Sequence, residues 1–264
     1  MTTMSIGKAW EESLAFIKRE GHLLFPVALL FLSVPLAIVQ QMIPANYMQL
    51  QPGQTLESLP PLPASVSLGV IVGAIVMLIG SLSVYALALR PGISVGEAIR
   101  LALSRLGVLV GASAIVGLAL LMAIFLVAMV GGLLAVAIGK GVGVQLSILL
   151  MTGVILYASA RLVPLSAVII DRRSGVIASL REALALTRGQ AGRMIVFLVI
   201  SMVLIFIIQF AVQAAIGVVG TLLLGKDSGR AITDLVVALA SGILNVYLMV
   251  LTARIYRQLE GVKP

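Results

Sequence analysis

The stretch Leu14-Ala15-Phe16-Ile17-Lys18 returns twice along the chain, as Leu101-Ala102-Leu103-Ser104-Arg105 and as Leu184-Ala185-Leu186-Thr187-Arg188. The second copy begins 87 residues after the first, and the third begins 83 residues after the second. The 264 residues divide into three blocks of 88. Each copy precedes apolar segments that are long enough to cross a membrane. The sequence therefore predicts three repeat units, approximately 1–90, 91–173 and 174–264, within a single integral membrane domain, 1–264.

Composition indicates a membrane protein. Hydrophobic residues make up 61% of the chain, charged residues make up 11%, and the mean hydropathy is +1.18, whereas soluble domains average roughly 45–50% apolar and 25% charged residues. Backbone groups in lipid must be satisfied within the segment, so long apolar runs predict helices. Six runs reach the length of about 20 residues that a crossing needs: 23–43, 66–89, 107–138, 142–170, 192–223 and 231–254.

These runs predict an all-α polytopic membrane protein with six transmembrane helices. The helices are arranged as three repeats, each a cytoplasmic amphipathic helix followed by a two-span hairpin. The third, fourth and fifth runs are longer than a straight crossing needs, which predicts tilt or ends that emerge from the bilayer. Segments of alternating polarity, which are typical of a membrane β-barrel, are absent from the sequence.

Lysine and arginine are distributed unequally between the two sides that the spans define. Three of them, Lys140, Lys226 and Arg230, lie on one side, and fifteen lie on the other. Short cytoplasmic loops accumulate Lys and Arg, so both termini are predicted to be cytoplasmic and the proline-rich segment 44–65 to be an extracytoplasmic loop. The fifteen are Lys8, Lys18, Arg19, Arg90, Arg100, Arg105, Arg161, Arg172, Arg173, Arg181, Arg188, Arg193, Arg254, Arg257 and Lys263.

The amphipathic segments around the three repeated stretches all lie on this cytoplasmic side. In the third segment, one helical face is shared by Val176, Ile177, Leu180 and Leu184. Such helices lie in the headgroup plane, with basic residues toward lipid phosphate. They are either connectors flattened against the membrane or contacts for anionic lipid headgroups or another membrane protein. The candidate contacts are Lys18, Arg19, Arg100, Arg105, Arg181 and Arg188.

Polar residues within the spans are further candidates. Apolar residues continue after Arg161, so its charge is predicted to be held within the bundle, with snorkelling to the interface as the alternative. Gln209 and Gln213 share a helix face and are predicted to bond across to Asn245. These amides serve either helix packing or a polar pathway for a solute. The candidate functional polar residues are Arg161, Pro164, Gln209, Gln213 and Asn245.

The sequence contains few of the residues and motifs that catalysis commonly uses. It contains no cysteine and one histidine, His22, and it lacks a phosphate-binding glycine loop and a metalloprotease helix motif. An enzyme is therefore not predicted, nor is a cofactor or a metal site. Nucleic acid is not a predicted partner, because the basic residues follow one membrane face and no nucleic-acid-reading module is present.

One region carries a recognisable signature. Arg161-Leu162-Val163-Pro164 is followed by Asp171, Gly175 and the helix 179–189, which ends in Thr-Arg-Gly. This pattern resembles the membrane domain found in front of some glycerophosphoryl diester phosphodiesterases and in many stand-alone bacterial inner-membrane proteins. In that family a separate soluble domain carries out phosphodiester chemistry, so the resemblance implies a membrane module in the bacterial inner membrane. The chain lacks the bulky aromatic that many family members carry near the start of the third amphipathic helix.

Three functional hypotheses follow from the sequence. The first is a non-catalytic inner-membrane protein that interacts with lipid or a protein partner through cytoplasmic interfacial helices. The second is a transporter or permease-like protein for a lipid or small amphiphile, with a pathway near Arg161, Gln209, Gln213 and Asn245. The third, a membrane-embedded hydrolase, lacks a nucleophile, base and metal set.

Overall fold

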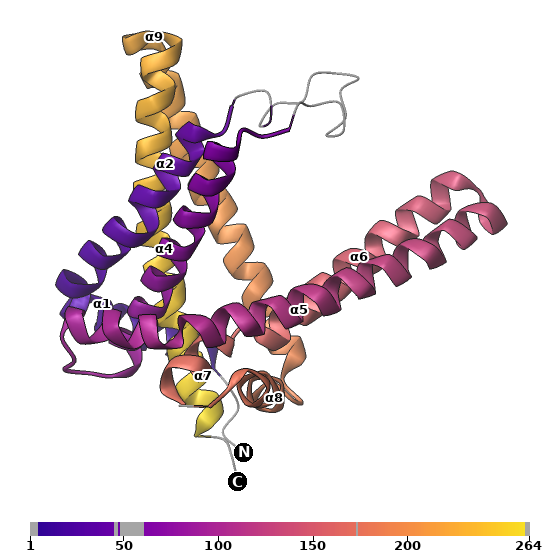
Figure 1. The fold of residues 1–264 in the computed structure, drawn as a ribbon, viewed down its shortest axis with the longest axis horizontal. Coiled ribbons are helices and arrows are strands. Elements are labelled where there is room, and N and C mark those ends of the chain that lie inside the picture. Colours follow the sequence, from indigo (N-terminus) through magenta and orange to yellow (C-terminus); the bar gives the residue numbers. More distant parts are fainter. Residues whose placement is uncertain (1–4, 45–46, 48–60, 173, 262–264) are drawn as a thin grey trace.

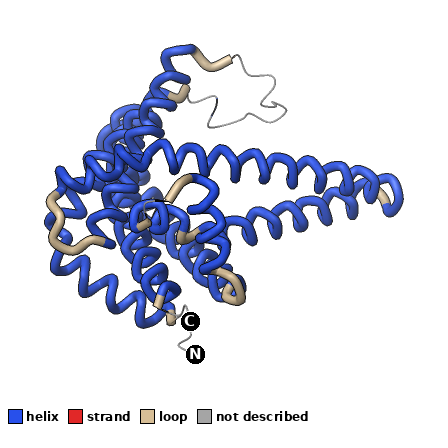
Figure 2. Tube along the Cα trace, turned by 60° about the horizontal axis from the view of Figure 1, so that its bottom comes forward, coloured by secondary structure: helices blue, strands red, loops and turns tan. Residues whose placement is uncertain are grey.

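A computed structural model describes residues 5–44, 47, 61–172 and 174–261 of the protein. Every regular element in these ranges is a helix (Figures 1 and 2). The sequence prediction of an all-helical protein is therefore confirmed for the described residues. The elements are α1 (Ile6–Ala28), the π-helical turn η1 (Leu29–Ser33), α2 (Val34–Met42), α4 (Ala64–Leu89), α5 (Val95–Ile138), α6 (Lys140–Leu162), α7 (Leu165–Asp171), α8 (Val176–Leu186) and α9 (Ala191–Glu260).

Within the part of the chain that the structure describes, six helical stretches are long and apolar enough to cross a membrane, as the sequence predicts. The α9 helix supplies two of them, because its backbone reverses at Gly225, whose φ of 79° is left-handed and strained for other residues. Proline-rich residues 48–60 of the predicted extracytoplasmic loop lie outside the described residues. The six stretches are Ile6–Met42, Ala64–Leu89, Val95–Ile138, Gly141–Asp171, Ala191–Gly220 and Ile232–Glu260.

The first two amphipathic segments are continuous with the spans that follow them. The chain is helical from Ile6 to Met42 through the π-helical turn, and α5 runs unbroken from Val95 to Ile138. The capping box at Ser94 starts α5: the Ser94 Oγ accepts from Glu97 N at 3.3 Å, and Glu97 Oε2 accepts from Ser94 N at 2.8 Å. No proline or left-handed glycine follows the cap within α5, so nothing ends the helix at the membrane edge.

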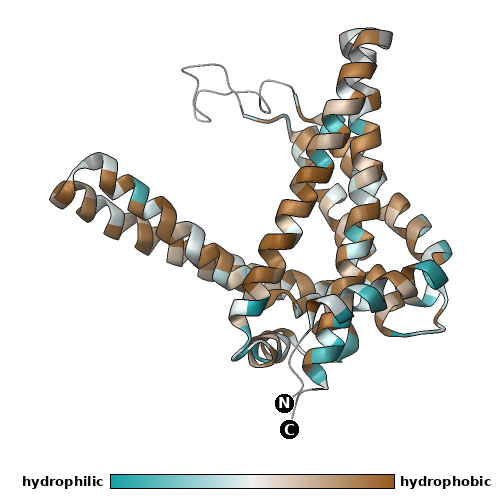
Figure 3. Ribbon diagram, turned by 180° about the vertical axis from the view of Figure 1, so that it is seen from behind, coloured by the Kyte–Doolittle hydropathy of each residue, from teal (hydrophilic) through white to brown (hydrophobic). Residues whose placement is uncertain are grey.

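The third amphipathic segment is a separate helix. The chain leaves α8 at Thr187, and Gly189 adopts a φ of 81°, which ends the helix before α9 begins at Ala191. Figure 3 shows hydrophilic residues gathered at the end of the molecule that holds α8 and the end of α9, whereas the long helices are mostly hydrophobic.

The predicted fourth span, 142–170, is divided in two. Pro164, which lacks a backbone N–H, stands between α6 and α7. The short α7 helix is almost entirely buried, with Leu165 and Ala167 through Ile170 in the core. Arg161 lies inside the candidate span Gly141–Asp171, but the break at Val163 and Pro164 places it in the last turn of α6, directly before α7.

The core lies where α4, α7 and the last turns of α9 meet. Residues 82–89 of α4 are all buried, and they pack with Ile169, Ile170 and Tyr256, whose side chains are fully buried. By contrast, the α5–α6 hairpin leans away from this bundle (Figures 1 and 2). With 44 residues, α5 is about 66 Å long, more than twice the roughly 30 Å hydrocarbon core.

Close helix approach at Gly80 leads to a stability prediction. A Cβ atom at Gly80 would lie 2.5 Å from Phe31 Cβ and 3.2 Å from the Phe31 carbonyl oxygen, which is backbone and cannot move aside cheaply. We expect Gly80→Ala to lower the free energy of unfolding in detergent by about 1–3 kcal/mol. Circular dichroism during thermal unfolding measures this change. Gly117→Ala is the matched control, because a Cβ there meets nothing within 4 Å; equal melting of the two variants would contradict the packing.

Candidate functional site

Three arginines, here called the span-ending arginines, have different surroundings in the structure. Arg90 and Arg254 stand at the ends of the second and sixth predicted spans, and Arg161 lies in the last turn of α6. The Arg90 guanidinium donates from Nη2 to the carbonyl oxygens of Ile170 at 3.0 Å and Asp171 at 3.4 Å. The Arg254 guanidinium carbon lies 4.5 Å from the centroid of the Phe16 ring, within range of a cation–π contact. The Arg161 side chain is half-buried, and its guanidinium forms no hydrogen bond or ion pair with any described residue.

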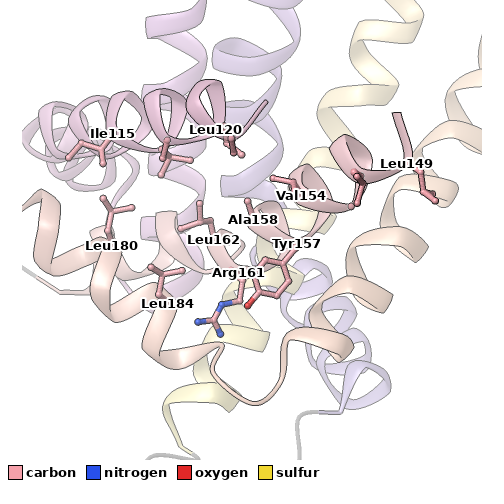
Figure 4. A pocket seen from close by; sticks show the side chains of 15 residues that line it. Ile115, Leu120, Leu149, Val154, Tyr157, Ala158, Arg161, Leu162, Leu180 and Leu184 are labelled. Carbon is pink, nitrogen blue, oxygen red and sulfur yellow. The ribbon is translucent and has the colours of Figure 1, made fainter. Parts of the chain in front are cut away.

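Arg161 lies at one end of an apolar groove of about 760 Å³ between α5, α6 and α8 (Figure 4). Tyr157 and Arg161 are the polar side chains of its lining, and in Figure 4 their polar ends lie near each other, below Leu162 and beside Leu184. Tyr157 is 53% exposed, so this end of the groove is open. The lining residues are Ile115, Val116, Ala119, Leu120, Ala123, Leu149, Leu150, Gly153, Val154, Tyr157, Ala158, Arg161, Leu162, Leu180 and Leu184.

The end of α8 is attached to the end of α6 by a buried threonine. The Thr187 hydroxyl lies 3.2 Å from the Arg161 carbonyl oxygen and 3.1 Å from that of Ala183, and donates toward both. Thr187 is fully buried, so this bond is shielded from competing water. The repeated stretch 184–188 therefore has a definite role in its third copy, which is to place α8 along the groove beside Arg161.

A second attachment holds α8 from its polar face. Arg172 contacts Glu182 of α8 (Nη1 to Oε1, 2.5 Å) and Glu260 at the end of α9 (Nη2 to Oε1, 2.9 Å). The Tyr256 hydroxyl donates to Asp171 Oδ2 at 2.9 Å. The pKa of the Arg172 guanidinium is raised, first by hydrogen bonding with Tyr256 and then by Glu260 and Glu182, while burial opposes the change. In the sequence, Arg172 is named only as one of the fifteen basic residues on the predicted cytoplasmic side, so these ion pairs were not predicted.

The predicted amide contact between the last two spans takes a different form. Gln209 Nε2 donates to Ser241 Oγ at 3.0 Å, whereas Asn245 Nδ2 donates to the Ser241 carbonyl oxygen within its own helix at 2.8 Å. The prediction that Gln209 bonds to Asn245 is therefore wrong, and Ser241, one turn earlier, is the partner. Gln213 and Asn245 are exposed. None of these residues lines the groove at Arg161.

The basic residues predicted to contact lipid or a partner are mostly exposed. Arg105 is half-buried, and Arg19 Nε donates to Glu20 Oε1 at 2.9 Å. Pro164, another predicted site residue, is buried as the cap of α7 and has a structural role. Among the residues that the structure describes, no three His, Asp or Glu side chains group to hold a metal ion. The exposed basic residues are Lys18, Arg19, Arg100, Arg181 and Arg188.

The ion pairs of Arg172 lead to a prediction about stability. We expect Arg172→Gln to lower the free energy of unfolding by about 2 kcal/mol, because two carboxylates at the junction lose a charged partner. Chemical denaturation in detergent, followed by circular dichroism, measures the loss. Lys8→Gln is the control, since Lys8 and Glu12 form an exposed pair at 3.9 Å that contributes little. An unchanged midpoint for Arg172→Gln would show that the junction does not depend on this side chain.

No protein-family model, curated protein or solved structure matches the chain. The resemblance to the phosphodiesterase membrane domain remains a prediction, carried by the signature residues within 161–189.

Proposed function

We propose that this is a non-catalytic membrane protein that binds a membrane lipid in the groove between α5, α6 and α8. The groove itself carries the proposal. Its volume of about 760 Å³ falls within the roughly 300–1,000 Å³ of small-molecule sites, which are mostly apolar with a few polar groups. Its walls are helices with many exposed apolar side chains, such as Leu118, Leu121 and Leu149, so a lipid reaches it sideways from the bilayer.

The composition of the groove supports binding rather than catalysis. Its lining residues include no serine, histidine or carboxylate, and a hydrolytic mechanism needs a nucleophile with an adjacent base or a metal-activated water. Transport is less well supported, because its predicted pathway residues do not converge. Arg161 lines the groove, whereas Gln209, bonded to Ser241, serves helix packing.

The proposed location is the bacterial inner membrane, with both termini in the cytoplasm. The excess of fifteen Lys and Arg residues over three supports this orientation. The beginning of α1 and the end of α9 lie together, since Ser5 N donates to Gln258 Oε1 at 3.1 Å. In this orientation α8 and Arg161 belong to the cytoplasmic side, and the groove draws its lipid from the cytoplasmic leaflet.

The orientation is testable by cysteine labelling, because the chain contains no native cysteine. Gly141→Cys and Ala178→Cys each place a thiol at an exposed position on opposite predicted sides. We expect a membrane-impermeant maleimide to label Gly141→Cys in intact spheroplasts and Ala178→Cys only after lysis. The cysteine-free parent controls for background labelling. The reverse pattern would invert the topology.

The groove is testable by filling it. Gly153 lines the groove, and a Cβ atom added there meets nothing within 4 Å. We expect Gly153→Phe to fold normally and to reduce the lipid that copurifies in mild detergent by at least about fivefold, as counted by native mass spectrometry, because the ring takes the space of the acyl chain. Gly132→Phe is the matched control on α5, exposed, equally unobstructed and outside the groove. Equal lipid on the wild type and both variants would refute a binding role for this groove.

A further inference from the structure

We infer that the groove selects a phospholipid whose headgroup carries an anionic phosphate and no amine, and that Arg161 binds this phosphate. The inference rests on the proposed lipid-binding function and adds the chemistry of the headgroup. Three observations support it: the division of the groove into an apolar length and one polar end, the absence of a counter-ion for Arg161, and the positive charge around that end.

Like a phospholipid, the groove is apolar along its length and polar at one end. Aliphatic side chains from α5, α6 and α8 line its length, and the polar ends of Tyr157 and Arg161 lie together at one end (Figure 4). An acyl chain along Ile115, Leu120 and Leu149 would therefore place its headgroup at Arg161. The Tyr157 hydroxyl provides a second hydrogen-bonding group there.

The Arg161 guanidinium has no counter-ion on the helices that form the groove. Glu97 and Glu182 are the only acidic residues of α5, α6 and α8. Glu97 is engaged in the capping box with Ser94, and Glu182 pairs with Arg172. A half-buried charge without a partner is unfavourable, because it gives up hydration and gains no Coulomb energy. An anion supplied by a ligand would complete the site.

The other two span-ending arginines each have a contact within the protein that Arg161 lacks. Arg90 is bonded to the carbonyl oxygens of α7, and Arg254 lies against the Phe16 ring. At two of the three positions, the guanidinium therefore has a contact within the protein. Arg161 alone of the three directs its guanidinium to the end of an apolar groove.

The surroundings favour phosphate over an amine-bearing headgroup. A planar guanidinium binds phosphate oxygens in a bidentate manner, which strengthens the bond relative to a single donor. Arg188 follows Thr187, which donates to the Arg161 carbonyl oxygen, so a second, exposed arginine is attached to the chain close to Arg161. A headgroup ammonium would meet two positive charges there and would bind less well.

The test uses the full-length protein in detergent with phosphatidylglycerol and phosphatidylethanolamine of identical acyl chains in equimolar competition, read by native mass spectrometry. We expect the wild type to retain phosphatidylglycerol preferentially. Arg161→Gln should lower phosphatidylglycerol affinity about tenfold and abolish the preference, and Arg161→Lys, which keeps the charge and loses the bidentate geometry, should fall between them. Arg193→Gln, an exposed arginine outside the groove lining, should change neither value by more than about twofold.

The outcomes separate this inference from the proposed function. Lipid binding that depends on Gly153 and shows no headgroup preference, or a preference that survives Arg161→Gln, would overturn the inference and leave the lipid-binding function standing. Lipid binding insensitive to both Gly153→Phe and Arg161→Gln would overturn both. Inorganic phosphate at the same concentration should not displace the lipid, because it lacks the acyl chains that fill the groove; displacement would identify a free-phosphate site instead. Unchanged thermal unfolding of Arg161→Gln verifies that the variant is folded.

Discussion

The buried position of α7 is the constraint on which the arrangement of α6, α8 and the end of α9 depends. Pro164 stops α6, and the apolar residues that follow form α7 in the core between α4 and the end of α9. The carbonyl groups at the end of α7 lie in the interior, where they need donors, and Arg90 supplies them. Because α7 occupies this place, Arg161 ends α6 at the surface of the core, and α8 begins beside it.

The two attachments of α8 follow from the same constraint. Arg172 directly follows α7, so the position of α7 determines where its guanidinium meets Glu182 and Glu260. Thr187 attaches the C-terminal end of α8 to the last turn of α6. The helix is thereby held at Glu182 and at its C-terminal end, and its apolar residues Leu180 and Leu184 line the groove. The α8 helix therefore forms a wall of the groove as well as the connection between α7 and α9.

The sequence predicts the features that depend on length, composition and local breakers. Six membrane-length apolar runs are visible directly, and Gly189, which separates α8 from α9, ends the Thr-Arg-Gly signature. The sequence does not show whether an amphipathic segment and the apolar segment after it form one helix. Their residue patterns are the same whether or not a helix break lies between them. The burial of α7 was missed since Leu165 to Ile170 have the composition of a span. The partner of Gln209 was misplaced by one turn, because Ser241 and Asn245 lie on the same helical face and register is not visible in one sequence.

The three span-ending arginines show why a sequence repeat does not imply three equal sites. Each arginine sits in a similar local sequence, with a tyrosine a turn or two earlier, yet its environment is set by the helix that packs against it. The end of α4 meets α7, which offers carbonyl oxygens, and the end of α9 meets α1, which offers Phe16. The end of α6 meets α8 and the leaning α5, which offer aliphatic side chains and leave a groove. A guanidinium satisfied by the protein has little to gain from a ligand, whereas one that ends an apolar groove gains an ion pair when a phosphate arrives. The different surroundings of the three arginines are therefore what makes Arg161 the one of the three that the proposed lipid-binding function involves.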